Sequence, residues 1–83
     1  MKRLYKQAYE HLESMGCPVY VHPDDDGNFS IDGEDPESYK WADYWNTDPI
    51  WIFGVNPVVD EVLRQYGLFS EWVNPGRLAV FEI

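Results

Sequence analysis

Turn-forming and helix-breaking residues recur along the whole chain, and they confine each regular element to a short segment. The apolar runs between them fall far below the roughly 18 residues that a membrane-spanning helix needs. The main interruptions are Gly16, the Asp24–Gly27 turn, Asp32–Gly33, the Thr47–Pro49 segment, Gly67 and the Asn74–Gly76 turn. The chain can therefore build only short helices and hairpins, which must pack on one another to bury their apolar faces.

Two segments have the periodicity of amphipathic helices, and both carry terminal signals. In residues 2–15, apolar side chains recur at helical spacing, and Gly16 follows where a left-handed C-terminal cap is expected. In residues 57–66, Asn56-Pro57 supplies an N-cap and a first-turn proline, and Gly67 closes the helix. The expected buried stripes are Leu4, Ala8, Leu12 and Met15 in the first helix, and Val59, Val62, Leu63 and Tyr66 in the second.

Two further segments are predicted to be β-hairpins. In residues 18–32, two runs rich in β-branched and aromatic residues flank the acidic turn. In residues 68–83, two apolar runs flank Asn74-Pro75-Gly76, whose Pro and Gly occupy the central positions of a type II turn. Strand alternation puts four side chains of the first hairpin on the buried face: Val19, Val21, Phe29 and Ile31.

Residues 36–46 are predicted to form a third, short helix. Asp35-Pro36-Glu37 is a favourable helix start, and Trp41, Tyr44 and Trp45 follow at helical spacing. The next apolar run, Ile50–Phe53, is either a buried strand or an apolar connector, because periodicity does not distinguish them.

These elements predict an α+β fold, in which the two hairpins form one small antiparallel sheet and the helices pack on one of its faces. The 83 residues are enough for a single compact domain, residues 1–83. So short a chain buries a smaller share of its surface than a large one. Its four Trp, six Tyr and four Phe therefore have to supply much of the core.

The negative charge is concentrated in the middle of the chain. The net charge is −9, and residues 24–48 hold nine Asp and Glu residues against Lys40, a net of −8. Phosphates would be repelled by such a chain, so we expect neither nucleic acid nor membrane as a direct ligand. A basic protein surface, such as that of a nucleic-acid-binding protein, is the expected partner.

Acidic and aromatic residues are interleaved over residues 34–51. The aromatic side chains either face the core or form, with the carboxylates, a surface of Trp and Tyr anchors that attracts basic residues. We expect replacement of the acids at 24–26 by Asn to leave folding intact. The candidate partner-binding residues are Asp24, Asp25, Asp26, Asp32, Glu34, Asp35, Glu37, Asp43, Asp48, Trp41 and Trp45.

The chain has no recognisable catalytic, metal-binding or cofactor-binding motif, and we expect no cofactor. Placing Gly27 or Gly33 at the sixth position of an EF-hand loop leaves no Glu at the twelfth position. An irregular cation site built from Asp24, Asp26 and Asp32 remains an alternative. Cys17 is expected to be a free, partly buried thiol rather than a nucleophile activated by His22, and His11 has no second ligand at metal-binding spacing.

The favoured function is therefore a non-catalytic, acidic protein-binding module that occupies a basic surface and competes with nucleic acid where that surface binds it. In size and charge, but in no motif, the chain is similar to small phage-encoded inhibitors of host nucleases or polymerases. One alternative is an assembly subunit or homodimer that pairs through the apolar C-terminal strand Leu78–Ile83. A metal-dependent or small-molecule enzyme is the third hypothesis. The single cysteine and the lack of a signal peptide predict a cytoplasmic location.

Overall fold

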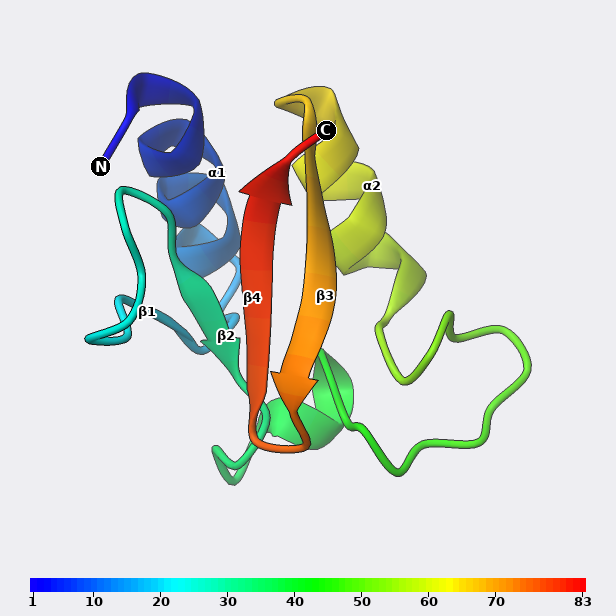
Figure 1. The fold of residues 1–83 in the computed structure, drawn as a ribbon. Coiled ribbons are helices and arrows are strands. Elements are labelled where there is room, and N and C mark those ends of the chain that lie inside the picture. The colour runs from blue at the N-terminus through cyan, green and yellow to red at the C-terminus, as the bar shows by residue number, and fades with distance from the viewer.

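The computed structural model describes residues 1–83 and shows a four-stranded antiparallel sheet with two helices on one face (Figure 1). The helices are α1 (Arg3–Ser14) and α2 (Pro57–Gln65), and a 3₁₀ turn, η1, spans Ser38–Lys40. The strands are β1 (Val19–Tyr20), β2 (Ser30–Asp32), β3 (Leu68–Asn74) and β4 (Arg77–Glu82). The predicted α+β fold with two merged hairpins is confirmed.

The strand order is β1-β2-β4-β3, so the two hairpins join through β2 and β4. The C-terminal strand β4 consequently lies inside the sheet, and β3 and β1 form its two edges. The homodimer hypothesis required the C-terminal strand to lie at the edge, and this condition is not met.

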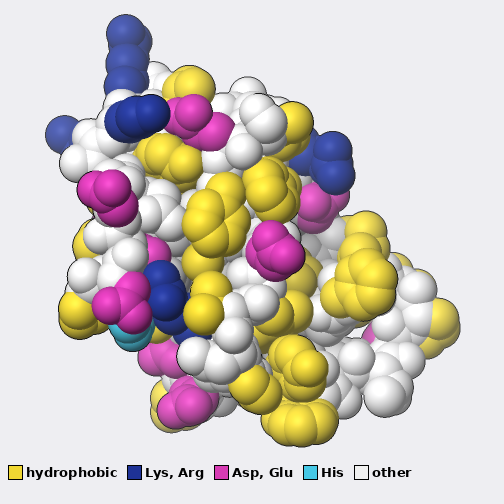
Figure 2. All heavy atoms as spheres, in the orientation of Figure 1, with side chains coloured by type: hydrophobic (Ala, Val, Ile, Leu, Met, Phe, Trp, Pro, Cys, Tyr) yellow, Lys and Arg dark blue, Asp and Glu magenta, His cyan; other side chains and the backbone are white.

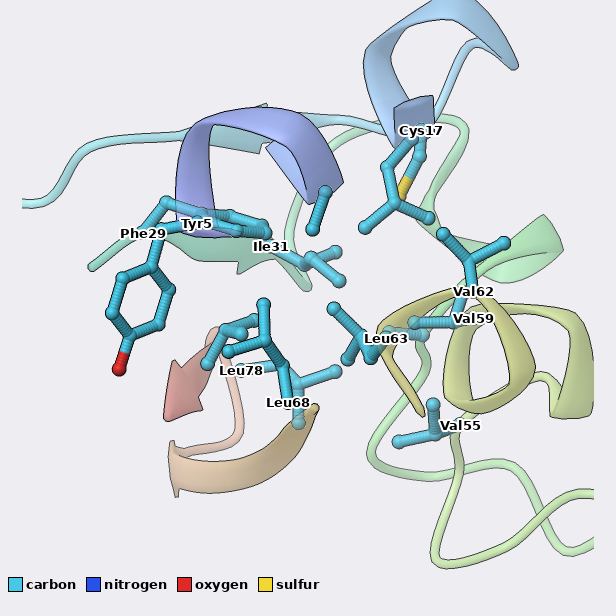
Figure 3. Close-up of a cluster of buried hydrophobic side chains, with 14 residues drawn as sticks. Tyr5, Cys17, Phe29, Ile31, Val55, Val59, Val62, Leu63, Leu68 and Leu78 are labelled. Carbon is cyan, nitrogen blue, oxygen red and sulfur yellow. The ribbon is translucent and has the colours of Figure 1, made fainter. Parts of the chain in front are cut away.

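The core lies between the sheet and the helices (Figure 3). Phe29, with no exposed surface, meets Tyr5 and Tyr9 of α1 edge-to-face, with ring centroids 6.5 and 5.4 Å away. Such pairs add to the burial of large apolar area. The buried apolar cluster comprises Tyr5, Ala8, Leu12, Cys17, Phe29, Ile31, Ala42, Val55, Val59, Val62, Leu63, Leu68, Leu78 and Val80.

Both long helices are confirmed, with one correction to their buried faces. Asn56 caps α2 through Oδ1, which accepts a hydrogen bond from the Val58 amide at 3.0 Å, and the Asp60–Arg64 pair forms at 2.9 Å. In α1, however, Leu4 and Met15 are exposed while Tyr5 is buried. The helix is rotated so that the tyrosines contact Phe29, because an aromatic ring buries more area than Leu4 would.

Two details of the hairpins differ from the sequence predictions. Val21 is exposed, since β1 ends at Tyr20 and the chain then turns over the outer face of the sheet. The Pro75–Gly76 turn is not type II, because Gly76 lacks the positive φ that this turn requires. The Asn74 side chain instead accepts a hydrogen bond from the Gly76 amide at 2.9 Å.

The predicted helix over residues 36–46 is wrong beyond η1. Asp43, Asn46 and Asp48 each accept a hydrogen bond from the backbone N–H two residues further on, at 3.1, 2.7 and 2.9 Å. These local bonds compete with helical hydrogen bonds, and three of them in succession fold the chain into a series of turns. Ile50–Phe53 continues this segment as an apolar connector rather than a buried strand.

Neither helix has the length and the apolar run that a membrane-spanning segment needs.

Candidate functional site

The segment between η1 and α2 carries five exposed large apolar side chains. We call residues 44–53 the apolar loop. Trp45, Ile50 and Phe53 keep 74%, 73% and 87% of their surface exposed, and Tyr44 and Ile52 are also exposed. The loop extends away from the sheet beside α2 (Figure 1), and hydrophobic side chains gather at that side of the molecule (Figure 2). Large apolar side chains that gather on one part of a surface mark an interaction site more often than a solvated face.

The base of the loop is fixed by backbone hydrogen bonds to the body of the protein. The Asp43 amide donates to the Gly54 carbonyl at 2.8 Å, and the Asn56 amide donates to the Trp41 carbonyl at 3.0 Å. Asn56 Nδ2 also donates to the Lys40 carbonyl at 2.9 Å. The exposed apolar side chains are therefore presented by a closed loop and not by a loose segment.

The loop ends in a tight turn at Phe53-Gly54. Ile52 and Val55 exchange two backbone hydrogen bonds, of 3.0 and 3.1 Å, across these two residues. Both central residues have positive φ, 51° for Phe53 and 76° for Gly54, which defines a type I′ turn. Asn, Asp or Gly is the usual residue at the first central position, and a phenylalanine in this conformation is strained by about 1–2 kcal/mol. Trp72 Nε1 holds the strained turn by donating to the Phe53 carbonyl at 2.7 Å.

We expect Phe53→Asn to raise the free energy of unfolding by about 1 kcal/mol, because Asn tolerates positive φ and the exposed ring loses no burial. Thermal unfolding should then shift upward by roughly 4–8 °C. Ile50→Asn is the matched control, since it removes an equally exposed side chain from a residue without positive φ. Equal effects of the two substitutions, or a loss of stability in Phe53→Asn, would contradict the assignment of strain.

A groove of about 880 Å³ separates the apolar loop from β3 and α2. Its volume lies in the range typical of ligand-binding clefts, roughly 300–1,000 Å³. Aromatic side chains line it from both sides, Trp51 and Phe53 from the loop and Phe69 and Trp72 from β3. The charged residues of its lining are Asp48, Asp60, Glu71 and Arg64, and Arg64 is paired with Asp60 at 2.9 Å. The groove is thus aromatic with an excess of negative charge.

The structure divides the acids of residues 24–48 among three segments. Asp24 and Asp26 lie in the loop between β1 and β2. Asp32, Glu34, Asp35 and Glu37 follow from the end of β2 to the start of η1. Asp43 and Asp48 lie at the base of the apolar loop and within it. On the face shown in Figure 2, acidic side chains are scattered between apolar ones. Of the two candidate tryptophans, Trp45 is exposed in the loop and Trp41 packs against the core.

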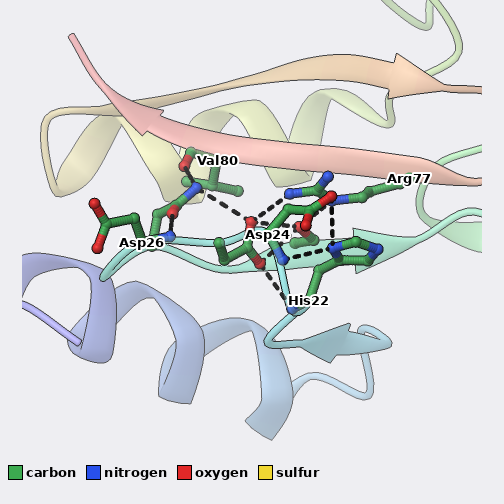
Figure 4. Close-up of polar contacts among 8 residues, drawn as sticks. His22, Asp24, Asp26, Arg77 and Val80 are labelled. Atoms are coloured by element: carbon green, nitrogen blue, oxygen red, sulfur yellow. Dashed lines mark hydrogen bonds and ion pairs between the residues drawn. The ribbon is translucent and has the colours of Figure 1, made fainter.

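Asp25 is the exception among the candidate acids, because its side chain is buried. Figure 4 shows the polar contacts between the loop that carries His22, Asp24 and Asp26 and Arg77 of β4. None of its side-chain surface is exposed, and it accepts a hydrogen bond from Arg77 Nη2 at 2.6 Å. Ser30 Oγ at 2.9 Å and the His22 amide at 2.8 Å also donate to this carboxylate. Asp25 is therefore not available to a partner, and we correct its assignment from contact residue to structural residue. The expectation that replacement of the acids at 24–26 by Asn leaves folding intact is accordingly withdrawn for Asp25.

The environment of Asp25 sets its ionisation. Burial by itself would raise the pKa of this carboxyl, but hydrogen bonds from the His22 amide, Arg77 and Ser30 outweigh burial and hold the pKa below its ordinary value. Asp25 is consequently ionised in the folded protein at neutral pH and forms a buried ion pair with Arg77, whose side chain is only 10% exposed.

The other titratable groups singled out in the sequence do not form a reactive site. Burial raises the pKa of Cys17 to about 12, so this residue is a neutral thiol near pH 7 and not a thiolate nucleophile. His11 Nδ1 and the Tyr66 hydroxyl form a hydrogen bond of 2.9 Å that joins α1 to the end of α2. No three His, Cys, Asp or Glu side chains come together in an arrangement that could hold a metal ion.

Sequence reasoning missed Ile50, Ile52 and Phe53 as surface residues and missed the groove. One local signal was present: Phe53-Gly54 lies between Ile52 and Val55, an apolar-X-Gly-apolar pattern related to the Asn-Gly hairpin signal. The pattern is hard to recognise because phenylalanine is disfavoured at the first position of this turn.

Comparison with protein-family models, curated proteins and solved structures finds no match to this chain.

Proposed function

We propose that this protein is an acidic protein-binding module that holds a basic partner protein through the apolar loop and the adjoining groove. The observation that carries the proposal is the exposure of Trp45, Ile50 and Phe53 on a loop that is closed at its base. A few aromatic side chains that become buried on binding supply most of the energy of a protein interface. Trp45 and Phe53 are exposed aromatic side chains that a partner could bury in this way.

Two further observations support this proposal. The Phe53-Gly54 turn keeps a strained and exposed phenylalanine, although Asn or Gly would fit the turn better. Strained residues that persist at exposed positions favour a functional role over a structural one. The net charge of −9 and the acidic lining of the groove select a partner with Arg or Lys beside its apolar contacts.

The proposal relies on the apolar loop more than on imitation of nucleic acid. Asp25 is buried, and the remaining acids of residues 24–48 are divided among three segments. We therefore assign the carboxylates to attraction and orientation of a basic partner. Competition with nucleic acid follows only where the partner's basic surface is also its nucleic-acid site.

The test starts with capture of partners from an extract of the native host cells, followed by identification of the bound protein and measurement of its affinity. We expect Trp45→Ala to weaken binding by about thirtyfold or more, because truncation of an aromatic anchor typically costs about 2 kcal/mol or more. The folding stability of this variant should be unchanged, since Trp45 is exposed. Raising the salt concentration to about 0.5 M should weaken the same complex by screening its charges.

Tyr39→Ala is the matched control, because Tyr39 is an exposed aromatic residue outside the apolar loop. The proposed contact surface would be contradicted if the captured partner bound wild type, Trp45→Ala and Tyr39→Ala with equal affinity. Binding that does not respond to salt would remove the electrostatic part of the proposal.

A further inference from the structure

β3 is an open edge of the sheet. It pairs with β4 on one side and with no strand on the other. The Ile83 amide donates to the Gly67 carbonyl at 3.0 Å, so hydrogen-bonded pairs recur at Phe69–Phe81 and Glu71–Ala79. Ser70 and Trp72, which alternate with Phe69 and Glu71 along the strand, therefore direct their backbone N–H and C=O groups away from β4.

The pairing of β4 supports this register independently. Val80, which faces Ser70 across the ladder, donates its amide to the Phe29 carbonyl at 3.0 Å on the other side of β4. It therefore has no N–H left for the Ser70 carbonyl. No other backbone or side-chain hydrogen bond of the protein reaches the peptide groups of Ser70 and Trp72 on this edge.

The open edge faces the groove. The groove lining includes Phe69–Trp72 of β3, Trp51–Phe53 of the apolar loop with the two residues that follow it, and Asp60 and Arg64 of α2. Four strand residues extend over about 13 Å. The unpaired backbone groups and the aromatic cleft therefore occupy the same place, which is the arrangement that receives an added β-strand.

The side chains around the edge define the chemistry of the occupant. Trp72 faces the core side of the sheet, and its indole reaches the Phe53 carbonyl across the groove. Phe69 and Glu71 point to the opposite face, because strand side chains alternate, and they line the groove from that side of the edge. An added strand would thus place every second side chain in the aromatic groove and the intervening ones beside Glu71. Apolar residues suit the first set and Lys or Arg the second.

We propose that the partner binds as an extended segment of alternating apolar and basic residues that adds a strand to the edge of β3 within the groove. This inference rests on the proposed function and specifies how its partner is held. A second copy of this chain is disfavoured as the occupant, since it would bring a net charge of −9 and its own Glu71 to an acidic edge.

The probe is a synthetic peptide of about nine residues in which Lys and Val alternate. Two derivatives carry N-methyl groups, one on all Val amides and the other on all Lys amides. In an added strand, either the Val amides or the Lys amides face β3, but not both. We expect the derivative that is methylated on the amides facing β3 to bind about tenfold or more weakly than the parent peptide. The derivative methylated on the other amides should stay within about twofold of the parent peptide. A Lys–Ser peptide of equal charge measures the purely electrostatic contribution.

The protein variants test the same edge from the other side. Ser70→Pro removes an N–H that points away from β4, so the β3–β4 ladder stays intact, and proline is tolerated at such edge positions. We expect this variant to fold but to lose peptide binding by about tenfold or more, whereas Ser70→Ala keeps the N–H and binds as wild type. In the wild type, hydrogen exchange at the Ser70 and Trp72 amides should slow when the peptide is added.

The outcomes separate this inference from the proposed function. A peptide that binds equally well with either set of N-methyl groups, or equally well to Ser70→Pro, overturns strand addition but leaves the Trp45 test of the apolar loop untouched. Lack of any binding by the Lys–Val peptide also overturns it. Conversely, loss of the captured partner in Ser70→Pro but not in Trp45→Ala would support strand addition and contradict the loop as the main anchor.

Discussion

Asp25→Asn is expected to lower the free energy of unfolding by about 3–5 kcal/mol, because it leaves Arg77 buried without a counter-charge. A domain of this length has a total stability of only about 4–12 kcal/mol, so the loss is a large fraction of it. Chemical denaturation of the two proteins at neutral pH measures the difference. Asp24→Asn is the matched control, because the carboxylate of Asp24 is exposed although the residue is next to Asp25 in the chain. The free energy of unfolding of this variant should stay within about 0.5 kcal/mol of the wild-type value.

The same pair of proteins gives a pH dependence with a defined sign. The folded-state pKa of Asp25 lies below its unfolded-state value of about 3.9. Its contribution is therefore fully present above that value and is lost as the pH falls through the lower, folded-state pKa. We expect the stability gap between wild type and Asp25→Asn to be constant near neutral pH and to narrow at acid pH. A gap that persists unchanged in strong acid would show that the carboxylate charge is not responsible.

Combining Asp25→Asn with Arg77→Met should restore part of the lost stability, because the second substitution removes the uncompensated buried charge. The double variant is then less destabilised than the sum of the single ones. Additive losses would mean that the two residues act independently, against the 2.6 Å contact between them.

Gly54→Ala is the second substitution for which we expect a large effect. A Cβ at this position would overlap the carbonyl oxygen of Asp43 and lie 3.0 Å from its carbonyl carbon. The residue also has a φ of 76°, which disfavours alanine by about 1–2 kcal/mol. Backbone cannot move aside without breaking the Asp43–Gly54 hydrogen bond at the base of the apolar loop. We expect a loss of about 3 kcal/mol in the free energy of unfolding and a Tm lower by roughly 10–20 °C.

Gly67→Ala separates the two causes of this effect. Gly67 has a φ of 71°, but nothing lies within 4 Å of the position of a Cβ. Its substitution should therefore cost only the conformational term, about 1 kcal/mol. Gly54→Ala should in addition weaken binding of the partner, since the loop loses its fixed base, while Gly67→Ala should bind normally. Equal thermal shifts in the two variants would show that the contact with Asp43 is relieved without cost.

Local patterns predicted the elements whose stability is local. The helices α1 and α2 and the two hairpins depend on residues that are neighbours in the sequence, and all four elements are found. The helix over residues 36–46 failed because the Asx turns of Asp43, Asn46 and Asp48 compete with it, and apolar spacing contains no information about that competition. Leu4 and Tyr5 exchanged places for a related reason, since the rotation of α1 is set by Phe29.

The sequence by itself determined this protein's net charge of −9, its high content of aromatic residues, and the short helices and hairpins that it can form. Only the tertiary structure decided which acid meets Arg77, that β3 rather than β4 lies at the sheet edge, and that Trp45, Ile50 and Phe53 stay outside the core. The reason is physical: periodicity and caps report interactions between near neighbours, whereas ion pairing, strand order and exposure depend on contacts between residues far apart in the chain.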